Sequence, residues 1–495
     1  MTVITINYPF PHQLYINNHL KMKKLMIVFL AAVLIAGLQQ MVHAQERVSP
    51  DTSVAAIIQK QFGERQVSAS LYYPSAVKRF YTARQFSPVW VVKQKNQKST
   101  WAAMLMIDCV LQYGLAHEDY HPKELLYDKL HLILEEPEKI TNLQKARFDI
   151  ILTDAMINLV NNLHFGKLNP YYTSARIDSE MINGFDAAQV LTLALGEADL
   201  MNNINAVQPR SKQYQDLQYQ MYLIKEVYTG DCYETPEADV RRIAINMERL
   251  RWVGIEGDSY IQINIPSYSL TYYRPDTSYQ FKVVVGKPST PTPTLESMIT
   301  HFTSAPEWKV PAKIFRKELL PKAIRDTAFL MNNHYAIYDR QGRFVDDRAS
   351  LLLVKKNPEN YYMTQSSGCD NALGLVVFRF KNIYDIYLHD TPEQKLFAKK
   401  ERAFSHGCIR VEQAQKLAAL LLNHDGTPGK IFTLLQAINN YQTKNFVLKT
   451  PVPIKVTYLT CEVINGYPVV YKDIYDLDER LEMQLYNIGQ NLSKR

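Results

Sequence analysis

Few cysteines, a small net charge and the lack of a long apolar segment limit what this sequence can encode. Only five cysteines occur in 495 residues, and no two are spaced as Cys-x-x-Cys. The pattern excludes a small disulfide-rich fold and indicates neither a zinc finger nor a dithiol redox pair. Because the number is odd, at least one thiol is expected to stay free. The cysteines are Cys109, Cys232, Cys369, Cys408 and Cys461.

The charge is only mildly positive, at +7, and no basic cluster marks a nucleic-acid partner. Residues 1–44 carry three lysines and no acidic residue, so the rest of the chain keeps 7 − 3 = +4. Such a balance suits an anionic polymer, cell wall for example, without requiring one. The 32 tyrosines fit a surface that binds carbohydrate or peptide polymers, although tyrosine also packs well in cores.

The longest uncharged apolar run, from Leu25 to Leu38, is too short for a typical spanning helix, which needs about 20 residues. It follows Met22-Lys-Lys24 and precedes Val42-His-Ala44, which together form the pattern of a secretory signal peptide. We therefore expect translation to start at Met22 and the protein to be exported to the periplasm, with no stable membrane span after cleavage. An uncleaved N-terminal anchor is the alternative.

Hydrophobic periodicity divides the chain into a lead (45–75), a mostly helical scaffold domain (76–235) and a β-rich domain (236–495), an α+β class. Helices are expected over 102–113, 119–135, 141–163, 187–195, 214–227, 237–251, 316–323, 412–422 and 477–486. Strands are expected over 260–266, 279–285, 308–311, 335–338, 375–380, 383–388, 454–459 and 469–472.

One short motif carries more chemistry than the rest, the run Ser405-His-Gly-Cys-Ile-Arg410 with His389 upstream in Tyr-Leu-His-Asp-Thr-Pro. A thiol is a strong nucleophile as thiolate, and a nearby imidazole can take its proton. Consecutive backbone N–H groups at His406, Gly407 and Cys408 could hold a developing oxyanion. This arrangement predicts a cysteine acyltransferase or hydrolase. The plainer alternative is a buried small cysteine and a structural histidine.

Both reactive side chains are expected at the ends of regular elements, where a rigid scaffold presents them. The strand 383–388 leads into His389, and Cys408 lies in a turn before the helix 412–422. The N-terminal dipole of that helix is expected to lower the pKa of the thiol.

Three segments together resemble the L,D-transpeptidase catalytic domain of the YkuD type: Asn371-Ala-Leu-Gly374, the run from Tyr384 to Pro392, and Ser405–Arg410. Within that family the chain is most similar to the large periplasmic branch typified by the YcbB protein. Further matches are Met247–Trp252, Val284–Pro288 and Lys317–Lys322, so the similarity covers roughly residues 237–475.

The resemblance implies a reaction on peptidoglycan stem peptides without any cofactor. Cys408 would attack the L-to-D peptide bond after the third residue of a tetrapeptide stem and form a thioester. His389 would be the general base, oriented by a backbone carbonyl such as that of Asp390, and Gly407 with Cys408 would form the oxyanion hole. An amine of a second stem would then give a 3→3 cross-link. Acylation by carbapenem-type inhibitors is implied likewise.

Four neighbours are expected on the substrate side: Ser405, His406, Arg410 and Tyr387. Arg410 could bind a stem carboxylate through two parallel hydrogen bonds. It could equally form a structural ion pair with Glu412 or Glu401.

Other features have alternatives that the residues leave open. Tyr387 could instead pack in the core, and Asp390 is interpreted as a turn residue. A zinc site at His389, His406 and Cys408 is disfavoured because the last two are only two residues apart. The partly irregular stretch 289–350 is expected to contain a lid over the site.

The sequence also departs from the large branch. The link between Tyr228 and Glu237 is too short for a separate peptidoglycan-binding module, so the cleft or the scaffold must hold the substrate. Cys369 is either a bystander or a disulfide partner of Cys461 or Cys232. Two other functions stay open: a carboxypeptidase or amidase that hydrolyses the same acyl-enzyme, and a catalytically silent wall-binding scaffold.

Overall fold

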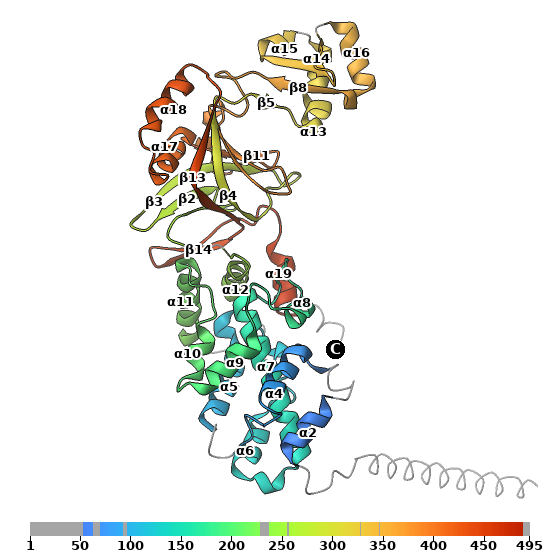
Figure 1. Ribbon diagram of the computed structural model, residues 1–495, viewed down its shortest axis with the longest axis vertical. Coiled ribbons are helices and arrows are strands. Elements are labelled where there is room, and N and C mark those ends of the chain that lie inside the picture. The colour runs from blue at the N-terminus through green and yellow to red at the C-terminus, as the bar shows by residue number, and fades with distance from the viewer. Residues whose placement is uncertain are drawn as a thin grey trace, which may run out of the picture.

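The computed structural model describes residues 53–62, 70–92, 97–227, 237–254, 257–326, 328–345 and 347–488. The expected signal region, residues 45–52 and 63–69 of the expected lead, and the link 228–236 with Cys232 lie outside these residues. Within the described residues no helix is long and apolar enough to cross a membrane. A helical half is followed by a β-rich half, which confirms the α+β class (Figure 1).

The helical half, up to residue 251, is built around α7 (Asn142–Phe165). This helix begins with a capping box in which the Thr141 hydroxyl accepts from the backbone of Gln144, whose side chain accepts from the backbone of Thr141. Nearly every side chain from Phe148 to Leu163 is buried, as expected for a helix enclosed by others. The other helices of this half are α2 (Val54–Gln61), α4 (Pro74–Ala83), α5 (Gln97–Asp108), α6 (Tyr127–Glu135), α8 (Ser174–Ser179), α9 (Ala187–Gly196), α10 (Leu200–Asn205), α11 (Lys212–Val227) and α12 (Ala238–Arg251).

Two of the expected helices differ from the structure. The helix expected over 102–113 ends at Asp108 and continues as a separate 3₁₀ turn, which Gly114 closes at φ +69°. The helix expected over 119–135 is regular only in α6, because Pro122 disfavours helical geometry at the residue before it. The helices expected over 141–163, 187–195, 214–227 and 237–251 are confirmed as α7, α9, α11 and α12.

The β-rich half contains a nine-stranded sheet in the order β11-β3-β12-β10-β9-β4-β13-β1-β2, and β2 also pairs with β3, so the sheet closes on itself. Its inward side chains alternate along the strands, and helices α17 (Ala414–His424) and α18 (Lys430–Asn439) pack against the same core. The strands are β1 (Tyr260–Asn264), β2 (Ser269–Arg274), β3 (Thr277–Gly286), β4 (Leu295–Ser304), β9 (Val376–Phe380), β10 (Leu388–His389), β11 (Ala403–Ser405), β12 (Ile409–Val411) and β13 (Lys444–Thr457).

An insert, residues 308–365, separates β4 from β9 and has its own small core around Phe315, Ile337 and Met363. Figure 1 shows it at the end of the molecule opposite the helical half. The expected irregular lid is thus largely a folded unit with the sheet order β5-β8-β6-β7. Its elements are β5 (Trp308–Lys309), α13 (Ala312–Ile314), η4 (Phe315–Leu319), α14 (Leu320–Arg325), α15 (Ala328–Asn332), β6 (Tyr335–Asp339), β7 (Phe344–Val345), α16 (Arg348–Lys356), η5 (Pro358–Asn360) and β8 (Tyr361–Gln365).

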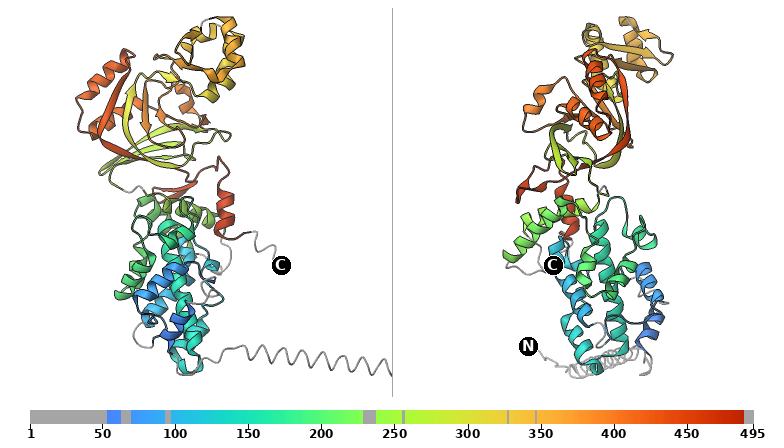
Figure 2. Two further views of the ribbon diagram at one scale, coloured as in Figure 1. Left: turned by 45° about the vertical axis from the view of Figure 1, so that its right-hand side comes forward. Right: turned by 60° about the vertical axis from the view of Figure 1, so that its left-hand side comes forward.

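The C-terminal segment returns to the helical half and ties the two halves together (Figure 2). The hairpin β14 (Cys461–Ile464) and β15 (Tyr467–Val470) and the helix α19 (Asp478–Leu485) contribute Cys461 and Leu485 to the helical core.

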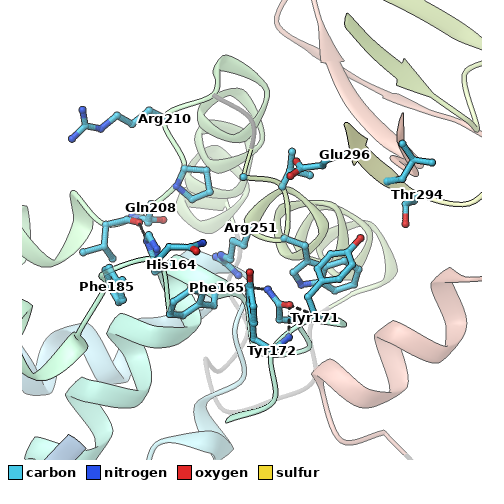
Figure 3. A pocket seen from close by; sticks show the side chains of 18 of the residues that line it. His164, Phe165, Tyr171, Tyr172, Phe185, Gln208, Arg210, Arg251, Thr294 and Glu296 are labelled. Atoms are coloured by element: carbon cyan, nitrogen blue, oxygen red, sulfur yellow. Dashed lines mark hydrogen bonds between the residues drawn. The ribbon is translucent and has the colours of Figure 1, made fainter. Parts of the chain in front are cut away.

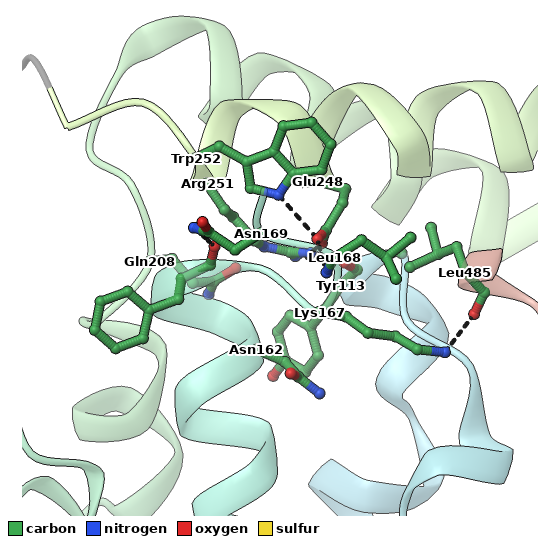
Figure 4. A network of polar contacts seen from close by, with 12 residues as sticks. Tyr113, Asn162, Lys167, Leu168, Asn169, Gln208, Glu248, Arg251, Trp252 and Leu485 are labelled. Carbon is green, nitrogen blue, oxygen red and sulfur yellow. Dashed lines mark hydrogen bonds and ion pairs between the residues drawn. The ribbon is translucent and has the colours of Figure 1, made fainter. Parts of the chain in front are cut away.

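A buried ion pair on α12 lies at the same junction (Figure 4). Arg251 and Glu248 are both fully buried and 3.2 Å apart. Glu248 also accepts from the Leu168 backbone (2.6 Å) and the Trp252 indole (3.0 Å), and Arg251 donates to the carbonyl of Tyr113 (2.5 Å). A buried pair with this many hydrogen bonds fixes the end of α12 where it enters the β-rich half.

Candidate active site

The predicted catalytic residues lie where two strands of the closed sheet pair. β10 pairs in parallel with β12, with Leu388 opposite Ile409 and His389 opposite Arg410. Leu388 and Ile409 point into the sheet core. Side chains alternate between faces, so the residues on either side of these two are expected to point the other way. Tyr387, His389 and Arg410 therefore lie away from that core, whereas Cys408, in the turn just before β12, is partly buried and packs against it.

Cys408 and His389 are diagonal neighbours where β10 and β12 pair. The Ile409 amide donates to the Tyr387 carbonyl at 3.2 Å, which places Cys408 level with Tyr387 and one pleat away from His389. Diagonal positions on adjacent strands are roughly 7–8 Å apart at the backbone, within reach of two side chains that lean together. No hydrogen bond joins the thiol to the imidazole among the contacts of the described residues; the thiol sulfur lies 3.9 Å from the carbonyl of Asp385.

The imidazole of His389 is oriented by the chain itself. Its Nδ1 lies 2.5 Å from the carbonyl oxygen of Asp390, as the family resemblance implies. A carbonyl can only accept, so Nδ1 carries the proton and Nε2 keeps a free electron pair. Burial, with the positive charge of Arg410 beside it, lowers the pKa of His389 to about 3. The ring is therefore a neutral base throughout the physiological pH range.

The thiol of Cys408 is protonated in the resting protein. Burial raises its pKa above the ordinary value of 9, while hydrogen bonds from the backbone and side chain of Tyr387 and the charges of Arg379 and Arg410 oppose that rise. The prediction that a helix dipole lowers the pKa of the Cys408 thiol is wrong. β12 follows Cys408 directly and α17 begins only at Ala414, because 409–411 joins the sheet instead of turning into a helix. The resting pair is a neutral thiol with a neutral imidazole.

The strand expected before His389 is also wrong. Only Leu388 and His389 pair in β10, and the preceding residues form a turn around Asn382. The Asn382 side chain accepts from the amides of Tyr384 and Ile386, each at 3.0 Å, and donates to the carbonyl of Ile386 at 2.7 Å. This turn chemistry competes with strand pairing.

The turn before Cys408 is held from inside. Ser405 is buried; its hydroxyl donates to the Cys408 carbonyl at 2.5 Å and accepts the Gly407 amide at 3.1 Å. Thr292 donates to the carbonyl of Gly407 at 2.7 Å. Gly407 has φ +120°, a conformation that side-chain-bearing residues avoid. Of the two backbone N–H groups expected to form the oxyanion hole, that of Gly407 already donates to the Ser405 hydroxyl, whereas that of Cys408 does not.

Two of the residues expected on the substrate side, Ser405 and Arg410, have partners within the protein. Ser405 is enclosed within the turn, so it shapes the backbone and does not face an open cleft. Arg410 forms its ion pair with Glu393, not with Glu412 or Glu401. Those two acidic residues pair with lysines elsewhere. Glu393 is well exposed, so Arg410 stays close to the surface beside the thiol.

Tyr387 and His406 link the sheet face to its surroundings. The centroid of the Tyr387 ring lies 5.7 Å from that of the His389 ring. The guanidinium carbon of Arg379 lies 5.3 Å from the centroid of the same Tyr387 ring. Tyr387 also packs against the core of the insert. His406 contacts Glu318 of the insert at 2.8 Å. The insert therefore contacts the residue before β10 through Tyr387 and the cysteine turn through His406.

Comparison with known proteins places these residues in a family. Two family profiles match the chain, one described as a scaffold domain over residues 75–221, the other as the L,D-transpeptidase catalytic domain, YkuD, over 258–454. The chain carries a YkuD-type L,D-transpeptidase catalytic domain.

A curated relative supports the same assignment. A protein of Haemophilus influenzae, provisionally named an L,D-transpeptidase, is 27% identical over 425 residues, which covers 84% of this chain and 81% of that protein. Solved L,D-transpeptidases from Mycobacterium smegmatis and Mycobacterium tuberculosis (L,D-transpeptidase 1) are 13% and 12% identical, with TM-scores of 0.18 and 0.16. Each match covers 40% of this chain and 58% or 61% of the other, less than two thirds of those structures.

Two expectations around the L,D-transpeptidase site concern Asp390 and Cys369. The Asp390 carboxylate accepts from the amide of Leu375 at 2.9 Å and from Gln394 at 3.1 Å, which is the geometry of a turn residue. Cys369 is exposed with a free thiol, and Cys461 is buried and free, so the disulfide between them is wrong. Cys461 packs in the helical core, far along the fold from the turn that holds Cys369.

Sequence reasoning missed several residues that build the L,D-transpeptidase site. Thr292, Glu318 and Arg379 come from three separate segments, and each contacts a motif residue only after folding. Thr292 could have been noticed, since Pro291 and Pro293 flank it and fix an extended backbone. Glu318 lies within Lys317–Lys322, a segment already noted for its family resemblance, and Arg379 carries no signal of its own.

Proposed function

We propose that the protein is an exported peptidoglycan L,D-transpeptidase, of the large periplasmic branch, that forms 3→3 cross-links through a thioester on Cys408. The observation that carries the proposal is the position of His389. Its Nδ1 is hydrogen-bonded to the Asp390 carbonyl, and the pairing of β10 with β12 places it diagonally across from Cys408. Nε2 is then the group that can accept the thiol proton.

The first half of the reaction makes the acyl-enzyme. The sulfur of Cys408 attacks the carbonyl carbon of stem residue three while His389 takes the thiol proton. The C–N bond to residue four then breaks, and the imidazolium returns the proton to the departing amine. A neutral pair suits this order, because the proton moves only as the C–S bond forms.

The second half transfers the acyl group. An amine of a neighbouring stem attacks the thioester, His389 takes its proton, and the C–S bond breaks to restore the thiol. Backbone N–H groups of the turn would stabilise the oxyanion in both halves. With the Gly407 amide directed to Ser405, we assign the main share to Cys408 itself. His406, Arg410 and Tyr387 would contact the stem peptides.

Intact-mass analysis with a tetrapeptide donor tests the proposal. The wild-type protein should gain the mass of the acylated tripeptide, and Cys408→Ser should not. Addition of an acceptor amine should release a cross-linked product, whereas release of a free acid would identify a hydrolase. An unmodified wild-type protein, with a carbapenem also failing to acylate Cys408, would reject the thioester altogether.

A further inference from the structure

A large cavity lies where the helical half meets the L,D-transpeptidase domain (Figure 3). Its volume is about 930 Å³, at the upper end of the roughly 300–1,000 Å³ that ligand pockets occupy. Residues of both halves line it, including Tyr171 and Arg210 from the helical half and Thr294, Glu296 and Tyr384 from the catalytic domain. A site built by two domains can hold a ligand only when both are in place.

Two chain segments lead from this cavity to the catalytic turn. In the first, Thr292 donates to the carbonyl of Gly407, and Thr294 lines the cavity two residues later. In the second, the Asp385 carbonyl lies 3.9 Å from the thiol sulfur, and its neighbour Tyr384 lines the cavity. Adjacent Cα atoms are about 3.8 Å apart, so the lining residues Thr294 and Tyr384 are each one or two residues along the chain from a contact with the cysteine turn.

A second cavity lies beside the first. A neighbouring space of about 380 Å³ shares part of the same wall, including Tyr171, Trp252 and Thr294. The two together extend along the junction between the halves. An elongated surface of this kind suits a segment of polymer better than a single small molecule.

The chemistry of the wall is that of a carbohydrate site. Two half-exposed tyrosines, Tyr171 and Tyr384, offer flat apolar faces with a polar edge. The exposed charges on the wall, Arg210 and Glu296, are of opposite sign. A pyranose presents an apolar C–H face and a rim of hydroxyl groups, which can pack on tyrosine and hydrogen-bond to such residues.

The wall is also rigid before any ligand arrives. Asn169 accepts from the amides of Tyr171 and Tyr172 and donates to the Phe165 carbonyl, which fixes the loop that carries the tyrosines. The Tyr171 hydroxyl hydrogen-bonds to Thr294 across the junction. Arg251, in its buried ion pair with Glu248, lies at the base. A preformed wall lowers the entropic cost of binding.

We propose that this interdomain cavity binds the amino-sugar backbone of peptidoglycan and so delivers a glycan-attached stem to Cys408. The inference rests on the proposed function and names the part of the substrate held outside the catalytic face. It also answers how a chain whose link is too short for a separate wall-binding module holds a polymer. The glycan lies along the junction, and the stem reaches the thiol past Tyr384.

Binding is measured with stem-free glycan oligomers of alternating N-acetylglucosamine and N-acetylmuramic acid, by saturation-transfer NMR and calorimetry on the exported chain. The wild-type protein should bind the oligomers, and Tyr171→Ala should weaken binding about 5- to 10-fold through the loss of one stacking ring. Ile383→Ala is a second variant, because this lining residue is 89% exposed and its truncation leaves the core intact. Tyr171→Phe keeps the ring and should bind nearly as well.

Tyr219→Ala is the matched control, since Tyr219 on α11 is as exposed as Tyr171 but lines neither cavity. The second readout is the ratio of kcat/KM for a glycan-linked tetrapeptide to that for the free tetrapeptide. Tyr171→Ala should lower the ratio about 5- to 10-fold. No oligomer binding, or an equal loss on both donors, overturns the proposal. Binding needs no catalysis, so this result stands apart from the thioester test: acylation without glycan binding rejects the cavity alone.

Discussion

The helical half and the catalytic face both bury polar side chains, but they treat them in opposite ways. In the helical half Asp149 is fully buried on α7 and accepts hydrogen bonds from the amides of Val89, Trp90 and Val91 and from the hydroxyl of Tyr81. On the catalytic face His389 is almost as buried, its Nδ1 donates to the Asp390 carbonyl at 2.5 Å, and burial lowers the pKa of the imidazole to about 3.

The difference separates structural from reactive burial. Asp149 satisfies amides that would otherwise be stranded in the interior, so its burial holds the chain segment 89–91 against α7. Burial of His389 and Cys408 instead keeps both groups neutral, with a proton that can move between them. The same desolvation therefore stabilises a fold where partners are complete and prepares chemistry where they are not.

The largest effect is expected when the proposed general base, His389, is removed. His389→Gln should lower the rate of acylation by about 10²- to 10⁴-fold, because the thiol then has no group to take its proton. The rate is measured by intact mass against time with tetrapeptide donor. Thermal unfolding of the same variant should stay close to wild type. A variant that acylates at the wild-type rate would remove His389 from the mechanism.

The structural side is tested by Asp149→Ala. Three backbone amides and a hydroxyl lose their acceptor, and since one unsatisfied buried group costs about 1–3 kcal/mol, we expect the free energy of unfolding to fall by roughly 3 kcal/mol or more. Denaturant unfolding of the full chain gives this value. Acylation per folded molecule should be little changed. Asp199→Ala, which removes only an exposed helix cap at Asn202, is the control and should cost about 1 kcal/mol.

The smallest effect concerns the charge state of the pair. The pKa of Cys408 is raised above 9, so its alkylation by iodoacetamide should still rise between pH 7 and pH 9. Tyr387→Phe removes a hydroxyl that favours the thiolate and should slow alkylation at pH 7 a few-fold. Peptide mass spectrometry follows Cys408 separately, with exposed Cys369 as an internal reference. A plateau below pH 7 would instead indicate a thiolate–imidazolium pair.

The acid side of the same profile follows from His389. Its pKa is lowered to about 3, so the imidazole stays an unprotonated base as the pH falls from 7 toward that value. An unfolded chain takes up this proton near pH 6.5, so acid favours unfolding, by at most about 1.4 kcal/mol per pH unit from this one group. Loss of activity near pH 5 should therefore track unfolding, not titration of the folded site.

Local signals predicted part of the fold well and part of it poorly. Helix α7 has a capping box and apolar residues at helical spacing, so its ends could be read within two residues. The turn around Asn382 was mistaken for a strand, because alternation in the apolar run through Ile383 and Ile386 looks the same whether or not a neighbour pairs with it. β12 was missed for the same reason, since three residues form a strand only when β3 and β10 lie on both sides.

The sequence by itself determined which atoms can react: a thiol after glycine, an imidazole before Asp390, and the carbonyl that orients that imidazole one residue away. Those are chain-local properties, set by residue type and by bonds between neighbours. Tertiary structure alone decided the charge state of the pair, the Glu393 partner of Arg410 and the cavity at the junction. Each of the three depends on desolvation or on groups distant in the chain, so no short segment of the sequence encodes it.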